Sequence, residues 1–303
     1  MNKNSLIINF DKLFKETNSK GPSTTGNASL GFQDQNLQKS IAILKEALAD
    51  NYRIDLGFTS NCITSGCRNI IKYLTKKKII DSIVTTAGGI EEDVIQVLDG
   101  EFKDIQLPFE DKELYLNGYL RSGNRVARSE GYIKLECYLE ALFDKYPKKT
   151  ISTSQIIRKI KLKGGYLNYL KEVYCPSIED GAIGDYLFLR SIRGLKTLNV
   201  TYTPDHVRYQ KNLLADNRKK LAIILGGSIP KHYILNSSIL SGGYDRVILL
   251  NTGLHYDGSN AGAEPSEAYS WGKVAQDGII VKVFGDFSIT FPLLLEKSGI
   301  DIK

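Results

Sequence analysis

The sequence has no hydrophobic run that approaches the roughly 20 residues needed to cross a bilayer. Its N-terminus, MNKNSLIINFDKLF, carries an apolar patch too short for a secretory leader, and no small-residue cleavage site follows it. Of the 303 residues, 42% are apolar and 24% are charged, an ordinary balance for a chain that buries a large core. These features argue against a membrane span and predict a cytoplasmic protein.

Cysteine and charge of one sign are also scarce. The four cysteines are Cys62, Cys67, Cys137 and Cys175, with no CxxC pair, which predicts a reduced compartment and no metal site. The net charge is only +6, and the 40 basic and 34 acidic residues are interspersed. No RNA or DNA motif accompanies the basic runs, which we expect to be solvated, so no nucleic-acid partner is predicted.

The chain divides into a short N-terminal part and one large unit. Residues 1–30 combine a short amphipathic segment with a flexible loop rich in Gly, Ser, Thr and Asn. Residues 31–303 alternate short apolar strands with helical segments, which is typical of a parallel sheet covered on both faces. The sequence therefore predicts an α/β, Rossmann-like fold in a single large domain, with residues 99–172 as peripheral insertions.

Individual elements follow from the same patterns. Strands are expected at RIDLGF (53–58), SIVTT (82–86), LAIIL (221–225), RVILLN (246–251) and IIVKVFG (279–285). Helices are expected at 36–48, 67–77, 90–98, 135–142, 156–160 and 286–297. SNCITSG (60–66) is predicted as a loop and AGG (87–89) as a turn.

Small and polar residues follow the expected strands, where a parallel sheet collects its functional groups. TSN (59–61), TTAGG (85–89) and GGS (226–228) each stand at such a strand end. Hydroxyls and free N–H groups at a helix start suit phosphate oxygens, although plain helix capping explains the same residues. No GxGxxG occurs, so a generic nicotinamide dehydrogenase is not supported.

Several acids lie in or beside glycine-containing segments. They are Asp180 and Asp185 in EDGAIGD, and Asp257 and Glu267 in YDGSNAGAEPSE. Turn chemistry explains an Asp–Gly pair by itself. If the four acids converge, however, their pocket would be strongly acidic and would favour a small polycation, because buried acids need a cationic partner.

Lys273 stands two residues after Trp271, the only tryptophan in the chain. A lysine becomes a nucleophile only when part of it is neutral, which needs desolvation or a neighbouring positive charge. Trp271 could supply an apolar wall for this purpose. Taken alone, Lys273 is interpreted as a surface charge, and His232, directly after GGSIPK, as a structural histidine.

Five motifs change this interpretation: TSNCITSG, TTAGGIEED, EDGAIGD, LGGSIPKH and YDGSNAGAEPSEAYSWGK. Together they resemble the deoxyhypusine synthase family, in the family's order from about residue 32 to 295. The resemblance implies NAD-dependent transfer of the aminobutyl group of spermidine to one lysine of the translation factor five A precursor. It also implies a covalent imine on Lys273, and a homotetramer with active sites at dimer interfaces, where Lys273 serves a neighbour's NAD site.

The resemblance assigns further roles by position. Lys273 and His232 take the catalytic positions. The NAD-binding positions are Ser60, Asn61, Thr64, Thr86, Ala87, Gly88, Glu92, Asp180, Gly227, Thr252, Gly253, Asp257, Asp286 and Phe287. The polyamine-binding positions are Glu91, Glu92, Asp185, His232, Asn236, Gly258, Ser259, Asn260, Glu267 and Trp271.

Three positions depart from the family pattern. Asn260 and Ala261 stand where eukaryotic members usually have an acid and a serine, and Ser228 replaces the third glycine of GGG. The lost carboxylate leaves homospermidine synthase as an alternative, which passes the aminobutyl group to putrescine. A catalytically inactive activating subunit is a second alternative, which the retention of Lys273 disfavours. Residues 5–14 are a candidate cover for a neighbouring active-site entrance.

Overall fold

The computed structural model describes residues 31–105, 110–146, 150–256 and 258–301. The predicted amphipathic segment and flexible loop of residues 1–30 lie outside this range, as does Asp257. Among the described residues, no helix has the length and apolar character that a membrane span requires.

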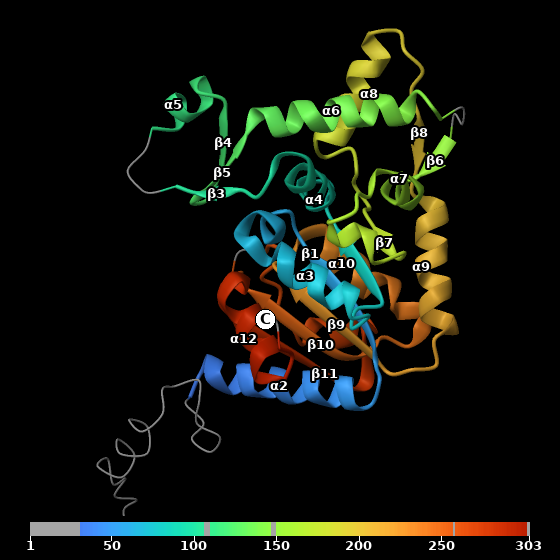
Figure 1. Ribbon diagram of the computed structural model, residues 1–303. Helices are drawn as coiled ribbons and strands as arrows, with labels where there is room; N and C mark the ends of the chain where they lie inside the picture. Colours follow the sequence, from blue (N-terminus) through green and yellow to red (C-terminus); the bar gives the residue numbers. More distant parts are fainter. Residues whose placement is uncertain (1–30, 106–109, 147–149, 257, 302–303) are drawn as a thin grey trace, which may run out of the picture.

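Six strands form a central sheet in which every neighbouring pair is parallel (Figure 1). The strands are β1 (Arg53–Phe58), β2 (Ser82–Thr85), β7 (Val173–Tyr174), β9 (Lys220–Leu225), β10 (Tyr244–Asn251) and β11 (Val274–Phe284). They lie side by side in the order β11-β10-β9-β1-β2-β7. The chain order reverses between β1 and β9, as it does in doubly wound dinucleotide-binding folds. The predicted Rossmann-like sheet is therefore confirmed, with β7 as a sixth strand that the sequence did not reveal.

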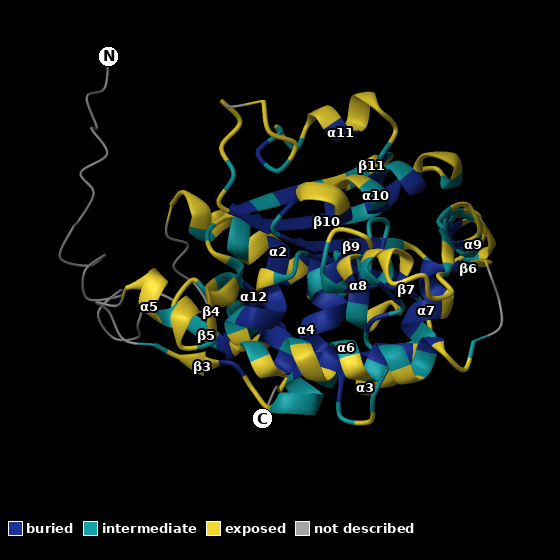
Figure 2. Cartoon of the chain, turned by 90° about the horizontal axis from the view of Figure 1, so that it is seen from above, coloured by how far each residue is buried: buried dark blue, intermediate teal, exposed yellow. Residues whose placement is uncertain are grey.

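Helices cover both faces of the sheet because alternate strand residues point to opposite sides. Leu221, Ile223 and Leu225 belong to one buried cluster, with residues of α2 (Gln33–Ala49), α3 (Arg68–Lys76), α4 (Ala87–Asp99) and α12 (Phe287–Lys297). Ala222 and Ile224 belong to a second cluster, with residues of α9 (Thr203–Ala215) and α10 (Ser228–Ser237). Figure 2 shows the buried strands enclosed between these layers.

The middle of the chain lies outside the central sheet, as predicted. It forms a three-stranded sheet of β3 (Lys103–Asp104), β4 (Tyr119–Ser122) and β5 (Arg125–Arg128), near α5 (Asp111–Leu116). Beyond it come α6 (Ser129–Phe143), α7 (Thr153–Ile160) and α8 (Ala182–Ile192), and a small sheet of β6 (Thr150–Ser152) and β8 (Asn199–Thr201). Short helical turns lie at η1 (Ile63–Cys67), η2 (Tyr166–Asn168), η3 (Ile239–Ser241) and α11 (Glu267–Ser270).

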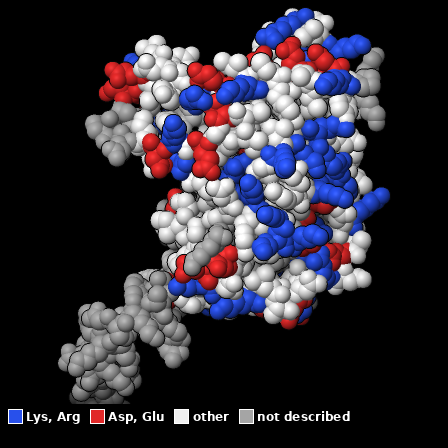
Figure 3. Space-filling model, viewed as in Figure 1, with Lys and Arg blue, Asp and Glu red and all other residues white. Residues whose placement is uncertain are grey.

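The two basic runs noted in the sequence lie at the surface. Lys76, Lys77 and Lys78 are exposed at the end of α3, and Lys159 and Lys163 are exposed at and after the end of α7. Figure 3 shows Lys and Arg side chains over this part of the molecule. Their exposure agrees with the expectation of solvated faces.

Two local predictions are wrong. SNCITSG is mostly a helical turn rather than a loop: residues 63–67 form η1, and Gly66, with φ of +100°, kinks it into α3. AGG is the first turn of α4 rather than a separate turn. There a Cβ on Gly89 would lie 2.1 Å from Thr85 Oγ1, so glycine is what lets the helix pack against the strand end. In both cases packing overrides the usual turn preference of glycine.

Candidate active site

The predicted cofactor residues stand after the carboxyl ends of all six central strands. Since these strands are parallel, their ends share one edge of the sheet. The residues are Ser60, Asn61 and Thr64 after β1, Thr86, Ala87, Gly88 and Glu92 after β2, Asp180 after β7, Gly227 after β9, Thr252 and Gly253 after β10, and Asp286 and Phe287 after β11. This is the edge at which doubly wound folds bind their ligands.

The segments after β1 and β2 are joined by direct contacts. The Ser60 backbone N–H donates to Thr86 Oγ1 at 3.2 Å, and Thr64 Oγ1 donates to Glu92 Oε2 at 2.6 Å. A Cβ on Gly88 would lie 2.6 Å from Ser60 Cβ, so only glycine allows this approach. The two strand-end segments therefore form one rigid wall.

Glu91 and Glu92 are buried in α4, at 4% and 9% exposure. Glu91 Oε1 accepts a hydrogen bond from the Ile183 backbone at 2.7 Å. Burial raises the pKa of Glu91 to about 7, helped by Asp185 and Asp180, and raises the pKa of Glu92 to about 8. Both carboxyl groups thus hold a proton for part of the time near neutral pH, and a bound cation would favour their ionised forms.

Tyr132 of α6 lies beside these carboxyl groups, and sequence reasoning missed it. Burial, together with the charges of Glu92 and Glu91, raises the pKa of Tyr132 to about 12. Its hydroxyl is therefore neutral at physiological pH. Tyr132 stands in a charged segment with no motif around it, so no signal in the sequence could have singled it out.

Lys273 lies in a separate cavity of about 210 Å³. The polar side chains that line this cavity are those of Lys231, His232, Asn260, Glu264, Glu267 and Lys273, next to the Trp271 ring. Lys273 Nζ is 5.5 Å from the centroid of that ring. Burial lowers the pKa of Lys273 while Glu267 opposes the shift, so its amine loses a proton more readily than that of an ordinary lysine. Trp271 is 65% exposed, which leaves this wall open to a ligand or another chain.

His232 and Asn236 lie one turn apart on α10 and line an adjoining cavity of about 420 Å³ with Asn260. Asn236 Nδ2 is 2.9 Å from His232 Nδ1. Asn236 Nδ2 also lies 3.3 Å from His232 Nε2, so the amide can donate to whichever nitrogen of a neutral ring lacks the proton. Burial, Lys273 and Lys231 all lower the pKa of His232, so the ring is neutral and able to take up a proton.

The sequence left open whether the four acids converge, and the three that the structure describes form two groups within one chain. Asp180 and Asp185 help to raise the pKa of Glu91. Glu267 instead favours the charged forms of Lys273 and Lys231 by raising their pKa values. Asp257 lies outside the described residues. Within one chain these three acids therefore do not share a pocket, because the segments after β7 and β10 follow strands in opposite halves of the sheet.

The segment of Gly258, Ser259 and Asn260 lies between β10 and α11 and packs back onto the β9 strand end. A Cβ on Gly227 would lie 2.5 Å from Ala261 Cβ, and a Cβ on Gly253 would lie 2.9 Å from the Gly262 nitrogen. The glycines therefore let this segment close over the strand ends. Closure places Asn260 at the border of both cavities that contain His232.

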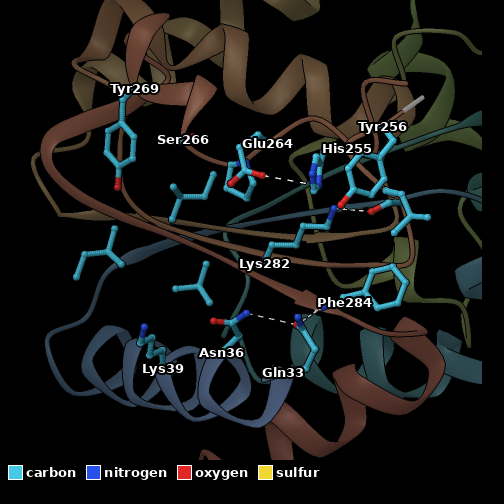
Figure 4. A pocket seen from close by; sticks show the side chains of 16 residues that line it. Gln33, Asn36, Lys39, His255, Tyr256, Glu264, Ser266, Tyr269, Lys282 and Phe284 are labelled. Atoms are coloured by element: carbon cyan, nitrogen blue, oxygen red, sulfur yellow. Dashed lines mark hydrogen bonds and ion pairs between the residues drawn. The ribbon is translucent and has the colours of Figure 1, made fainter. Parts of the chain in front are cut away.

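A larger cavity, of about 610 Å³, lies between α2, β11 and residues 253–269 (Figure 4). In it Lys282 Nζ donates to the Gly253 carbonyl, and His255 Nδ1 lies 4.0 Å from Glu264 Oε2. Of the described residues to which the sequence assigned roles, only Gly253 lines this cavity. This larger cavity is therefore a weaker candidate for the active site than the cavity of Lys273. Lys282 nevertheless anchors the segment that borders both cavities.

The fold and the site define a doubly wound α/β protein with phosphate-compatible strand ends and a lysine-bearing pocket. The chain belongs to the deoxyhypusine synthase family, because the model of that family, "Deoxyhypusine synthase", matches residues 25–298. Members of this family are transferases that move an aminobutyl group. The resemblance found in the motifs is thus confirmed.

The relatives include two activities. A homospermidine synthase of Senecio vulgaris is 38% identical over 265 residues, covering 81% of this chain and 70% of that protein. A deoxyhypusine synthase of Arabidopsis thaliana is 36% identical over 264 residues, with the same coverages. A crystal structure of a candidate deoxyhypusine synthase from Entamoeba histolytica has a TM-score of 0.64 at 23% identity, over 91% of each chain, and supports the fold.

Proposed function

We propose that this protein transfers the aminobutyl group of spermidine, with NAD as cofactor, to a specific lysine of the translation factor five A precursor. The observation that carries the proposal is the setting of Lys273. Its amine lies in a cavity beside Trp271 and Glu267, with a lowered pKa, in a member of the deoxyhypusine synthase family. A partly neutral lysine is what covalent capture of an imine requires.

The strand ends fit a dinucleotide. Helices α4 and α10 begin at this edge without a side-chain cap, so N–H groups of their first turns are available to phosphate oxygens. Helix α12 begins there too, but Asp286 caps its Ser288 N–H. Asn251 Nδ2, at the end of β10, is buried and has no partner among the described residues, so a donor is available there. Bound NAD supplies the hydride chemistry, in which the carbon beside the secondary amine of spermidine is oxidised and later reduced.

The residues of the chain would then act on the polyamine. Glu91, Glu92 and Asp185 hold its ammonium groups, and the cation ionises the two buried carboxyls. The neutral ring of His232 accepts a proton from the reacting amine. The neutral amine of Lys273 adds to the oxidised carbon and 1,3-diaminopropane leaves, so that the aminobutyl group is held as an imine on Lys273. The acceptor lysine displaces Lys273, and reduction completes the transfer.

We further propose a cytoplasmic homotetramer whose active sites are completed across dimer interfaces. In one chain the acids around Glu91 and the cavity of Lys273 form separate groups. Trp271, beside Lys273, is 65% exposed, and Tyr256, which lines the larger cavity, is 81% exposed. Such exposure of large apolar side chains is consistent with coverage by a neighbouring chain. Lys273 would then serve the cofactor site of its neighbour.

Homospermidine synthesis is the second candidate function. Asn260 replaces the acid usual in eukaryotic family members, and homospermidine synthases of Senecio are as similar to this chain as the deoxyhypusine synthases are. Loss of one carboxylate weakens recognition of one amine, which bears on which polyamine is held.

A single incubation distinguishes the two candidate functions. The protein is given NAD, putrescine, the translation factor precursor of its source and spermidine labelled in the aminobutyl group. We expect the label on one lysine of the factor, whereas label in homospermidine would favour the second function, and label in neither would contradict both. Lys273→Ala is the control, since unchanged activity would instead support an activating subunit. Asn260→Asp then tests the polyamine preference.

A further inference from the structure

Two of the four cysteines lie at opposite ends of one short helical turn. Cys62 precedes η1 as its N-cap residue, and Cys67 is the last residue of η1. Both thiols are free, and neither has a role in the proposed reaction. They are buried, at 0% and 3% exposure, in the same cluster of the core. Since small apolar side chains would fill the same space, packing alone does not require two thiols here.

The shape of η1 brings the two cysteines together. It is a π-type turn, whose backbone hydrogen bonds join residues five positions apart, which is the separation of Cys62 and Cys67. Ser65 links their surroundings, because its Oγ lies 3.0 Å from the Cys62 carbonyl oxygen and 3.6 Å from Cys67 Sγ. The thiol of Cys62 also donates a hydrogen bond to the sulfur of Cys67. The two sulfurs are thus neighbours in the reduced protein.

The two thiols differ in how readily they lose a proton. The hydrogen bond from Cys62, helped by one from Ser65, lowers the pKa of Cys67 to about 7, although burial opposes the shift. Burial raises the pKa of Cys62 well above the usual range of a thiol. The thiolate is the form that attacks an oxidant, so Cys67 is the nucleophile of the pair and Cys62 is the thiol that resolves the product.

A small oxidant can reach this pair through one turn of the chain. Gly66, directly before Cys67, is exposed, and Ser65, whose hydroxyl contacts the Cys67 sulfur, is half-buried. Gly66 has a φ of +100°, a conformation that is easily adjusted at a glycine. A hydroperoxide is small and uncharged, so local opening of η1 is sufficient for contact.

The same turn carries part of the wall formed by the predicted cofactor residues. Asn61 directly precedes Cys62, and Thr64 lies between the two cysteines. Thr64 Oγ1 donates to Glu92 Oε2 at 2.6 Å, which ties η1 to the next strand-end segment. A disulfide holds its sulfurs about 2.04 Å apart, much closer than a hydrogen bond does. Forming one would therefore tighten η1 and move Thr64 relative to Glu92.

We propose that Cys62 and Cys67 are a modification site for hydroperoxides, and that their oxidation to a disulfide disrupts the cofactor wall. With hydrogen peroxide, the Cys67 thiolate attacks one oxygen, the O–O bond breaks, and hydroxide leaves and takes up a proton to become water. The sulfur of Cys62 then attacks the sulfenic acid of Cys67, the S–S bond forms, and a second water leaves. The two thiols lose two electrons, which reduce the peroxide, and a dithiol reductant reverses the change.

The effect on the cofactor wall rests on the proposed function, whereas formation of the disulfide does not. The experiment therefore has two parts, and the first needs neither spermidine nor NAD.

In the first part, reduced full-length protein is treated with hydrogen peroxide, alkylated, and cleaved after Lys and Arg. This cleavage leaves both cysteines on the single peptide of residues 54–68, which mass spectrometry follows. We expect the peptide to become lighter by two hydrogen atoms and to escape alkylation, and a dithiol reductant to reverse both changes. Cys67→Ala should give no such product. Cys62→Ala should leave a sulfenic acid on Cys67, which dimedone traps, and Cys137→Ala, at an exposed cysteine, should behave as the wild type.

In the second part, aminobutyl transfer is measured before oxidation, after oxidation and after reduction. The oxidised wild type should lose activity on the order of a hundredfold and regain it on reduction, because displacement of a site residue by about 1 Å has an effect of this size. Cys67→Ala should keep its activity in peroxide. If Cys67→Ala does not fold, Cys67→Ser provides the same comparison.

The proposal is wrong if the peptide of residues 54–68 gains no disulfide, or gains one only at peroxide concentrations that unfold the protein. It is also wrong if the disulfide forms without loss of transfer, or if Cys67→Ala is inactivated as the wild type is. Failure of the proposed function would show separately, as absence of transfer by the reduced wild-type protein, and the first part would still decide whether the disulfide forms.

Discussion

Burial of the Glu92 carboxyl makes the stability of the protein depend on pH. In an unfolded chain the pKa of a glutamate is near its model value of 4.5, and in the folded protein burial raises that of Glu92 to about 8. Between these values the folded state binds more protons than the unfolded state. Proton binding by Glu92 therefore stabilises the folded protein. This stabilisation is fully present below pH 4.5, the pKa in the unfolded chain, and is lost as the pH rises through about 8, the pKa in the folded protein.

Glu92→Gln should remove this contribution to the pH dependence. Glutamine is neutral at every pH and can still accept the hydrogen bond from Thr64 Oγ1. We expect the wild-type protein without ligands to lose thermal stability from about pH 5 to pH 8, and Glu92→Gln to lose less over the same range. The control is Glu110→Gln, an exposed acid, which should leave the slope unchanged. An equal slope in wild type and Glu92→Gln would contradict the assignment.

Individual site residues could be predicted from the sequence only through their motifs. Lys273 was assigned to the site because SWGK and the preceding acids match the family pattern, and Glu91 and Glu92 were assigned in the same way. Lys231 and Tyr132 were not found, because their importance lies in burial next to groups that are distant in sequence. A buried lysine and an exposed one are the same letter in a sequence.

At the scale of elements, α10 begins in an unfavourable backbone conformation. Ser228 is its first residue and has a φ of +56°, in the left-handed region that favours glycine. This is the position where the family has the third glycine of GGG. The departure recognised in the sequence thus has a structural consequence at the β9 strand end.

Ser228→Gly should stabilise the protein. Removing the Cβ relieves the backbone strain of the folded state. This gain outweighs the entropic cost of ordering a glycine, so the free energy of unfolding should rise by about 1 kcal/mol. The melting temperature should rise on the order of 2 °C. Ser191→Gly, at an exposed position of α8 without positive φ, is the matched control and should destabilise slightly. A lower melting temperature in Ser228→Gly would show that the serine makes a compensating interaction.

The elements differed in how well the sequence predicted them. The five longer strands were predicted because three or more apolar or β-branched residues stand between clear turn signals. β7 was missed because a strand of two residues, Val173 and Tyr174, is too short to show any periodicity. The start of α4 was misplaced because the glycines of AGG serve close packing against β2, which is a long-range contact. Strand order likewise depends on contacts that no local pattern contains.

At the scale of the whole molecule, we propose that two chains complete each active site. Subunits with Lys273→Ala would keep an intact cofactor wall, and subunits with Gly88→Val would keep an intact lysine cavity. In Gly88→Val the new side chain meets Ser60, so the cofactor wall is disrupted. If sites are shared, neither variant alone can complete one, but a mixed assembly can.

Coexpression of these two variants should therefore restore part of the aminobutyl transfer that each lacks. Lys273→Ala coexpressed with Trp271→Ala is the control and should regain nothing, since both changes lie in the lysine cavity. Light scattering should show an assembly of four chains in the wild type. Inactive mixed assemblies would indicate that each chain completes its own site.

The proposed function depends above all on a covalent link at Lys273, and that link can be trapped. The protein is incubated with spermidine and NAD, treated with borohydride, digested and analysed by mass spectrometry. We expect an aminobutyl adduct on Lys273 that depends on NAD and is absent in Lys273→Ala, whose activity should fall by at least about a thousandfold. An adduct on Lys231 instead, or no adduct in a wild-type protein that transfers the aminobutyl group, would contradict the proposed role of Lys273.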